Sequence, residues 1–290
     1  MGLPVWNGER YLTVALESIL GQTATDLEVV VSDNASSDGT QAIARDFAAR
    51  DSRVRYLRNP TNIGANRNYN RVIQLSRGTY FKLGSDDDLL EPTYIEKTTA
   101  VLDADPTISI AHSAIRYIDD EGFALSYDPL QGRYVDRSGH TSIEPPDANC
   151  ATDDDPVARF RAVLRRSTTS HFALGVLRMS VLRRSVGFGL YYSADRAFLA
   201  EMALYGRFAA IPEVLFHKRE HRQNSRSLTP EQRARWAGQA RAARHAEYLH
   251  LLRIILSSPL GPWDKTRCLA VGAGKIALRT GGYLRRARQG

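Results

Sequence analysis

Residues 78–92 read GTYFKLGSDDDLLEP and place three carboxylates directly after a short apolar run. The apolar run predicts a buried strand, so Asp86, Asp87 and Asp88 follow the end of that strand. Neighbouring carboxylates repel one another, and removing them from water costs free energy unless a cation lies nearby. The triplet is therefore either a solvated loop leading into a helix cap or the site of a metal ion.

A second aspartate triplet, in ATDDDPVARF, provides a comparison. Its Asp155 precedes Pro156 and an amphipathic pattern, as expected of a helix N-cap followed by proline. After the first triplet, Pro92 is predicted to open the next helix with Glu91 as its cap, which leaves the aspartates without a structural role. Hard cations such as Mg²⁺ or Mn²⁺ prefer oxygen ligands and often share them with substrate phosphates. The first triplet therefore favours a metal site.

Apolar runs and helical patterns alternate through the first 118 residues. Strands are predicted at 27–33, 54–58, 79–83 and 108–118, and helices at 10–20, 39–50 and 66–76. The alternation is typical of βαβ units and predicts an α/β fold, a Rossmann-like, mainly parallel sheet flanked by helices. Ligands bind at the carboxyl ends of parallel strands, where the SDN and GSDDD segments lie.

The pattern loosens after about residue 120. A polar stretch, 128–156, predicts a long surface loop, which is usually functional or disordered. Regularity returns with helices predicted at 157–166 and 194–206, a strand leading into a helix at 172–184, and a strand at 208–219. One long helical pattern then covers 230–256, and a further segment follows at 262–280.

Charge is distributed unevenly along the 290 residues, whose net charge is +7. Residues 217–290 hold 16 Lys and Arg against four Asp and Glu, and the remainder has a net charge of −5. This basic end is either a contact for anionic membrane or another polyanion, or a solvated helical face. No signal peptide or membrane-spanning run is predicted. Cys150 and Cys268 fit no disulfide framework, as is typical of a reducing cytoplasm.

Four segments, taken in order, resemble the family 2 glycosyltransferases, whose fold is called GT-A. They are GLPVWNGERYL, VVVSDNASSDGT, NPTNIGANRNYN and GSDDD, and the resemblance is close over about 3–118 and loose to about 225. It implies a catalytic domain over 1–225, with a nucleotide-binding half at about 1–118 and an acceptor half at about 119–225. A basic helical C-terminal extension follows over 226–290.

The resemblance also implies roles for individual residues. Trp6 stands where the family has an aromatic residue against the nucleotide base, and Asp33 stands where a carboxylate binds the base edge. Asp86 corresponds to the ribose-side carboxylate and Asp87 to the metal ligand, with Asp88 and His221 as further candidates for Mn²⁺ or Mg²⁺. The remaining predicted nucleotide-sugar-binding residues are Pro4, Asn7, Asn62, Gly64, Asn70, Arg219 and Arg222.

A catalytic base is expected at the second acidic segment, YYSADRAFLAEMALYGRF. Asp195 stands at the head of an amphipathic helix, where the family has the aspartate that deprotonates the acceptor hydroxyl. The structural alternative is a helix N-cap, a role that the same aspartate can combine with catalysis. Glu201, nearly two turns further on, is interpreted as structural.

We therefore expect a metal-assisted, inverting transfer of a sugar from a UDP- or dTDP-sugar to a hydroxyl, in polysaccharide, glycolipid or cell-envelope glycan synthesis. Expected partners are the nucleotide-sugar donor, a glycan or lipid-linked acceptor and an anionic membrane surface contacted by 230–290. No nucleic-acid partner is expected, and the expected location is the cytoplasm, peripheral at the inner face of the membrane.

Two other functions remain open. A sugar-nucleotide nucleotidyltransferase would need a Gly-rich phosphate loop after the first strand, where PVWNGERYL offers one glycine. A nucleotide-sugar-binding protein without catalysis is the other alternative. Because only three residues precede Pro4, the first strand is expected to be short: either the chain starts upstream or this central strand loses an edge.

Overall fold

The computed structural model describes residues 1–137, 142–143, 151–165, 169–221, 225, 228–238 and 245–286. Its first part is a parallel sheet in the order β1 (Gly2–Val5), β2 (Val29–Asp33) and β3 (Val54–Arg58). Every residue of β2 is buried, because it is the middle strand and helices cover both faces of the sheet. The predicted parallel sheet is confirmed here.

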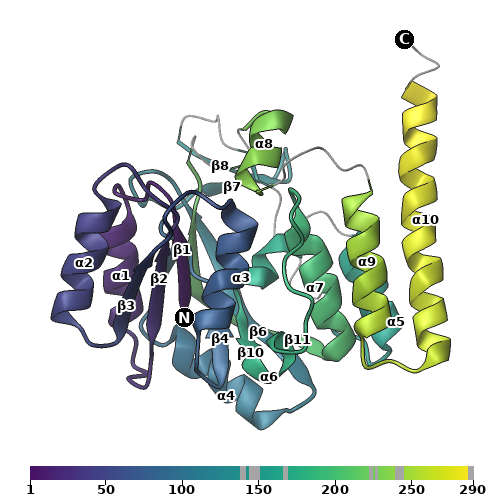
Figure 1. Ribbon diagram of the computed structural model, residues 1–290, viewed down its shortest axis with the longest axis horizontal. Coiled ribbons are helices and arrows are strands. Elements are labelled where there is room, and N and C mark those ends of the chain that lie inside the picture. Colours follow the sequence, from purple (N-terminus) through teal and green to yellow (C-terminus); the bar gives the residue numbers. More distant parts are fainter. Residues whose placement is uncertain are drawn as a thin grey trace.

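Helices on both faces of this sheet form two cores (Figure 1). α1 (Leu12–Leu20) and α2 (Thr40–Arg50) share one core with the strands, in which Leu16 packs near Val29. α3 (Ala65–Leu75) belongs to the other core through Val72, which packs near Phe81. The periodicity of each helix decides which side chains enter these cores.

The short first strand is paired on both sides. All four residues of β1 pair with β2, and Gly2 also forms a parallel bridge to Leu83 at the end of β4 (Tyr80–Lys82). A Cβ on Gly2 would lie 2.7 Å from Cβ of Val72, so glycine permits the close approach of α3. β1 therefore joins the parallel sheet to the second sheet.

The second sheet is mixed, in the order β4, β10 (Val176–Arg178), β6 (Ile108–Ile118), β11 (Arg207–Arg219) and β5 (Leu89–Leu90). β11 runs parallel to β6, whereas β10 runs antiparallel to both of its neighbours. The α/β fold is thus as predicted, and parallel pairing occurs both in the first sheet and between β6 and β11.

Several helices pack around this mixed sheet and against one another. They are α4 (Tyr94–Ala104), α5 (Pro156–Arg165), α6 (Met179–Leu182), α7 (Ala194–Tyr205) and a 3₁₀ turn at Thr169–Leu174. α7 lies against α5 and is buried along most of its length, with Phe198 and Leu199 in the core. Asp155 accepts from Val157 N at 3.1 Å, so its predicted role as the cap of α5 is confirmed.

The sequence interpretation is wrong on Pro92, on Glu91 and on the polar stretch 128–156. Pro92 does not open a helix, because Leu89 and Leu90 first pair with β11 and α4 begins only at Tyr94. The Glu91 carboxylate accepts from His217 Nε2 at 2.7 Å and caps no helix. The polar stretch 128–156 is not all loop, because β7 (Ser126–Asp128), β8 (Arg133–Val135) and β9 (Ser142–Ile143) form a small antiparallel sheet. Cys150 lies outside the described residues.

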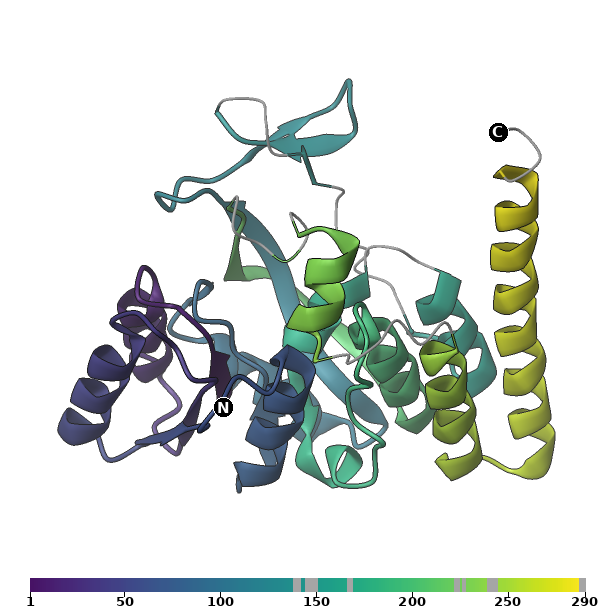
Figure 2. The same cartoon turned by 45° about the horizontal axis from the view of Figure 1, so that its top comes forward.

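The C-terminal extension consists of α8 (Pro230–Trp236), α9 (Ala246–Ser257) and α10 (Pro262–Arg286). The single long helix predicted for 230–256 is wrong, because α8 ends at Trp236 and Gly238 takes a φ of +81°. α9 packs on α7, and α10 runs back along α5 and α9 (Figure 2). Within the described residues, no helix has the length and apolar character needed to cross a bilayer. Arg241 and Arg244, two of the cations in the basic end of the chain, lie outside the described residues.

Candidate active site

A cavity of about 1610 Å³ opens at the carboxyl ends of β1, β2 and β4. Strand-end loops form one side, and the start of α7, the end of β11 and α8 contribute the others. Most of the predicted site residues line it: Pro4, Trp6, Asn7, Asn62, Gly64, Asp86, Asp87, Asp88, Asp195, Arg219 and His221. The topology thus brings together residues from both halves of the chain.

Two predicted residues do not line the cavity. Asp33 is fully buried and accepts from Tyr56 Oη and Ser36 N, both at 2.8 Å, and pairs with Arg58. Burial alone would raise the pKa of Asp33, but these hydrogen bonds outweigh it and lower the pKa. Asn70 exchanges hydrogen bonds with the backbone of Phe188, which itself lines the cavity. Arg222 lies outside the described residues.

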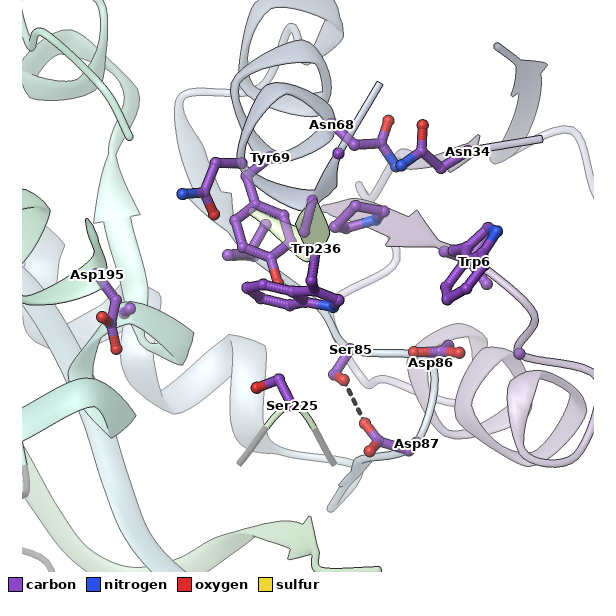
Figure 3. A pocket seen from close by; sticks show the side chains of 18 of the residues that line it. Trp6, Asn34, Asn68, Tyr69, Ser85, Asp86, Asp87, Asp195, Ser225 and Trp236 are labelled. Carbon is purple, nitrogen blue, oxygen red and sulfur yellow. Dashed lines mark hydrogen bonds between the residues drawn. The ribbon is translucent and has the colours of Figure 1, made fainter. Parts of the chain in front are cut away.

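Trp6 and Asn7 play different parts at the end of β1. The Trp6 side chain is 51% exposed and borders the cavity, so it is no core aromatic (Figure 3). Asn7 has a φ of 54°, and its Oδ1 accepts from Ser37 N at 2.8 Å while its N donates to Ser36 Oγ. Asn7 therefore holds the loop after β2 in place beside Trp6.

Amide side chains form the wall between β2 and α3. Asn34 Nδ2 donates to Asn62 Oδ1 at 2.9 Å, and the same oxygen accepts from Gly64 N. Asn34 Oδ1 accepts from Ile63 N at 2.9 Å. This interlocked pair positions the start of α3. Asn34 was given no role from the sequence, although its place after Asp33 at a strand end is the same signal that selected its neighbours.

The aspartate triplet separates into three environments. Asp87 Oδ2 lies 3.0 Å from His221 Nε2, and Ser85 Oγ donates to the other carboxylate oxygen. Asp88 is buried and accepts from Arg219 N at 2.9 Å. Asp86 lies against Gly8, where a Cβ would come within 2.1 Å of its Oδ2, so glycine leaves room for this carboxylate.

These environments give the three carboxyls different proton affinities. Burial and the neighbouring Asp87 charge raise the pKa of Asp86 to about 7 and that of Asp88 to about 8. Burial also acts on Asp87, but hydrogen bonds from His221 and Ser85 and the charges of His221 and Lys218 lower its pKa. Asp87 is therefore the carboxylate that remains ionised, beside an imidazole nitrogen at the cavity wall.

Arg219 organises the site from within. Its Nε donates to Asp87 O at 2.9 Å, and its Nη1 donates to the backbone oxygens of Asp119 and Asp120. Its guanidinium also lies 4.6 Å from the ring centroid of Tyr11. Arg219 lines the cavity, but its guanidinium is hydrogen-bonded to backbone oxygens of the neighbouring loops and does not project into the cavity.

Asp195 reaches the cavity from α7, in the second half of the chain. It lies in the first turn of α7, after Ser193, which has a φ of 65°, so it is not the N-cap. Figure 3 shows it on the opposite side of the cavity from Trp6. Burial raises the pKa of the Tyr69 hydroxyl, and the charges of Asp195, Asp86 and Asp87 add to this shift. Glu201 on the same helix is buried away from the cavity and accepts from Val186 N at 2.7 Å, as its structural interpretation predicts.

Residues of α8 complete the cavity, and sequence reasoning missed them. Gln232, Arg235 and Trp236 line it, and the Trp236 ring lies 6.1 Å from that of Tyr69 in an edge contact (Figure 3). A capping box between Thr229 and Gln232 starts this helix. The Thr-Pro-x-Gln start before Trp236 is the sequence signal for this helix, although the Arg-rich composition of the same segment favours membrane contact.

Protein side chains at this site supply only some of the ligands that a metal ion needs. Among the residues that the structure describes, no three His, Cys, Asp or Glu side chains gather as a metal centre. Asp87 and His221 supply one carboxylate and one imidazole at the cavity wall. Such a pair suits a cation that takes its other ligands from substrate phosphates and water.

Comparisons with solved structures agree with this architecture. S. aureus TarS bound to UDP-GlcNAc has a TM-score of 0.63 and 17% identity, covering 94% of this chain and 71% of that one. The mannosyltransferase PcManGT from Pyrobaculum calidifontis, in complex with GDP-Man and Mn²⁺, has a TM-score of 0.52 and 19% identity, covering 98% and 79%. These likenesses define the class of fold as that of the GT-A glycosyltransferases.

The family follows from the sequence comparisons. The model described as glycosyl transferase family 2 matches residues 2–166, more than half of the chain, and this protein belongs to that family, as predicted. Chondroitin synthase of Escherichia coli is 34% identical over 124 residues, 43% of this chain and 18% of the relative. The uncharacterized glycosyltransferase MJ1057 of Methanocaldococcus jannaschii is 28% identical over 118 residues, 40% of this chain and 41% of the relative. The chain covers less than half the length of these relatives.

Proposed function

We propose that this protein transfers a sugar from a nucleotide diphosphate donor to an acceptor hydroxyl, with inversion at the anomeric carbon. The observation that carries the proposal is the shared cavity, in which Asp86 and Asp87 from the end of β4 and Asp195 from α7 meet. Membership of glycosyl transferase family 2 supports the reaction class.

The donor would lie at the carboxyl ends of the parallel strands. The exposed Trp6 offers a flat face for a base, and Asp86 lies beside Gly8 at the same strand ends. TarS has been solved with UDP and with UDP-GlcNAc, and PcManGT with GDP-Man. We propose a UDP- or dTDP-sugar as the donor. Asp33 would act indirectly, by holding the loop after β2.

Asp87 and His221 would hold Mn²⁺ or Mg²⁺ together with the donor diphosphate. Bound there, the ion supplies Lewis-acid neutralisation of the diphosphate charge. The low pKa of Asp87 keeps its carboxylate available for this role, because it stays ionised while Asp86 and Asp88 hold protons more tightly. His221 would offer an imidazole nitrogen to the ion.

Asp195 would act as the general base. A new bond forms between the acceptor oxygen and the anomeric carbon as the bond to the diphosphate oxygen breaks, and the hydroxyl proton passes to Asp195. Its position across the cavity from Trp6 suits attack from the face opposite the leaving group. One displacement of this kind inverts the anomeric configuration without a covalent intermediate.

The acceptor would enter between α7 and α8. Trp236 and Arg235 offer an aromatic edge and a cation at this side of the cavity, a combination suited to sugar rings and their hydroxyls. A glycan or lipid-linked acceptor of polysaccharide, glycolipid or cell-envelope glycan synthesis fits this wall. The location at the inner face of a membrane stays a prediction, as does the domain boundary at residue 225.

A screen of nucleotide sugars tests the proposal. The protein is incubated with UDP-, dTDP- and GDP-sugars, with and without Mn²⁺, and release of the nucleoside diphosphate is measured. Mn²⁺-dependent release from one donor supports a transferase. Formation of pyrophosphate from a nucleoside triphosphate and a sugar phosphate would support the nucleotidyltransferase instead. Thermal stabilisation by a nucleotide sugar without turnover would indicate a binding protein.

A further inference from the structure

The α9 helix carries an apolar stripe that the rest of the described chain does not cover. One face of α9 is buried against the body of the protein through His250, Leu251, Ile254 and Ile255. On its other face Leu249, Leu252 and Leu256 are 66%, 41% and 57% exposed. Their spacing places these three leucines along one side of the helix. A helix packed on a body and otherwise solvated would carry polar residues there.

Trp263 extends the stripe at the turn between α9 and α10. Its side chain is 74% exposed in the first turn of α10. Lys265 Nζ donates to Leu256 O at 2.8 Å, so this turn closes on the end of α9 at which Leu256 lies. Large exposed apolar side chains on neighbouring turns of one hairpin mark an interaction site, and tryptophan is favoured where an apolar phase meets water.

The same hairpin is strongly cationic. Residues 245–290 hold eight Lys and Arg against two acidic residues, and no Asp or Glu follows Asp264. Arg253 lies on the exposed side of α9, within the stripe that Leu249 and Leu256 define. Apolar side chains flanked by cations match a surface that has an anionic exterior and an apolar interior.

We propose that the lipid-docking face, defined as Leu249, Leu252, Arg253, Leu256 and Trp263, seats the protein on an anionic lipid surface. α9 would lie in the plane of the headgroups with its leucines directed inward. A second copy of the chain is the other occupant that the test below distinguishes. A nucleic acid would match the charge and leave the leucines in water.

The buried face of α9 connects this surface to the cavity. His250 Nδ1 and Tyr191 Oη lie 2.9 Å apart, and Asn66 Nδ2 donates to Tyr191 O at 2.8 Å. Tyr191 belongs to the segment that leads into Asp195, and Asn66 lines the cavity. Docking through α9 would therefore place the lipid surface on the side of α9 opposite Tyr191, whose segment leads to Asp195. This last step rests on the proposed function, and the docking itself does not.

Vesicle sedimentation of the full-length protein tests the proposal. Vesicles of phosphatidylcholine with about a third phosphatidylglycerol should bind the protein at low salt and release it as salt rises, and pure phosphatidylcholine should bind it weakly. The variant Leu252→Gln/Leu256→Gln/Trp263→Gln should lower the partition coefficient at least about tenfold. Leu130→Gln, an exposed leucine in the β7–β8 turn, is the matched control and should bind as the wild type does.

Further readouts separate the possible failures. Thermal unfolding and nucleotide release without vesicles should be unchanged in the triple variant, because its residues are exposed and lie outside the cavity. Absence of binding to anionic vesicles at low salt overturns the proposal, and so does unchanged binding by the triple variant. A dimer in light scattering that the triple variant loses assigns the face to a second copy and overturns it too. Wild-type protein that binds vesicles but releases no nucleotide supports the face and contradicts the proposed function instead.

Discussion

His221 Nε2 lies 3.0 Å from Asp87 Oδ2, although 134 positions separate these residues in the sequence. β11 makes the contact possible, because it crosses the mixed sheet beside β6 and delivers its end to the loop after β4. Arg219, two residues before His221, fixes the same loop through Asp87 O. The candidate metal site therefore depends on the last strand of the fold as much as on the aspartate triplet.

His221→Gln is expected to weaken the response to Mn²⁺. The amide lacks the imidazole lone pair, so the Mn²⁺ concentration for half-maximal turnover should rise at least about tenfold. A titration of nucleotide release against Mn²⁺ measures this. His217→Gln is the matched control, since His217 lies on β11, the strand that leads to His221, and pairs with Glu91 outside the cavity. Equal Mn²⁺ dependence in the two variants would remove His221 from the site.

Asp195→Asn is expected to lose turnover and keep donor binding. The base acts on the acceptor in the transition state, so kcat should fall by about two to four orders of magnitude. Calorimetric titration with the donor should give an unchanged Kd. Glu201→Gln removes a carboxyl from the same helix and should keep its turnover. An Asp195→Asn enzyme as fast as the wild type would place the base elsewhere.

Gly64→Ala is expected to displace α8 from the cavity. Gly64 has a φ of +84°, and a Cβ there would lie 2.3 Å from Cα of Gly238, which follows α8. Neither backbone can give way cheaply, so kcat/KM should fall about ten- to a hundredfold as Trp236 moves. Gly272→Ala, in open space on α10, should leave kcat/KM unchanged. Unchanged kinetics in Gly64→Ala would show that closure by α8 is dispensable.

Glu201→Gln is expected to change the pH dependence of stability. Burial raises the pKa of the Glu201 carboxyl from 4.5 to about 7. The folded state therefore holds this proton more tightly than the unfolded chain, and the wild type loses stability as the pH rises across that window. Glutamine does not titrate, so the variant should gain up to about 3 kcal/mol relative to the wild type between about pH 4.5 and about pH 7. Urea unfolding of both proteins at about pH 4.5 and about pH 7 measures their difference in stability. A difference that does not change with pH would refute the raised pKa.

Local patterns were sufficient to predict much of the fold and the cavity. Apolar runs that end in Trp6, Asp33 and Asp86 place these residues at neighbouring strand ends, because parallel strands share one polarity. Helix periodicity likewise predicted the region of α7 that carries Asp195. These features depend on residues close together in the chain.

Contacts between distant segments could not be predicted in this way. The Asp33 carboxylate accepts a hydrogen bond from Tyr56 and pairs with Arg58, both on the next strand. The residue pattern of one strand does not show contacts with its neighbour. The helical pattern of 230–256 continues past Trp236, so it does not reveal that α8 ends there. The helix ends because Gly238 takes a positive φ, and a glycine in the sequence does not by itself show its φ. The place of Trp236 over the cavity depends on where the chain turns after Trp236, and composition does not encode it.

Asp87→Asn tests the central claim most directly. With the donor identified by the screen, nucleotide release in the presence of Mn²⁺ is measured for the wild type, Asp87→Asn and Asp155→Ala. We expect Asp87→Asn to remain folded and to lose Mn²⁺-dependent release, because amide oxygen replaces the ionised carboxylate. Asp155→Ala should lose about 1 kcal/mol of stability through the cap of α5, together with its ion pair to Arg267, and keep its turnover. Wild-type turnover by Asp87→Asn in Mn²⁺ would contradict the account of this site.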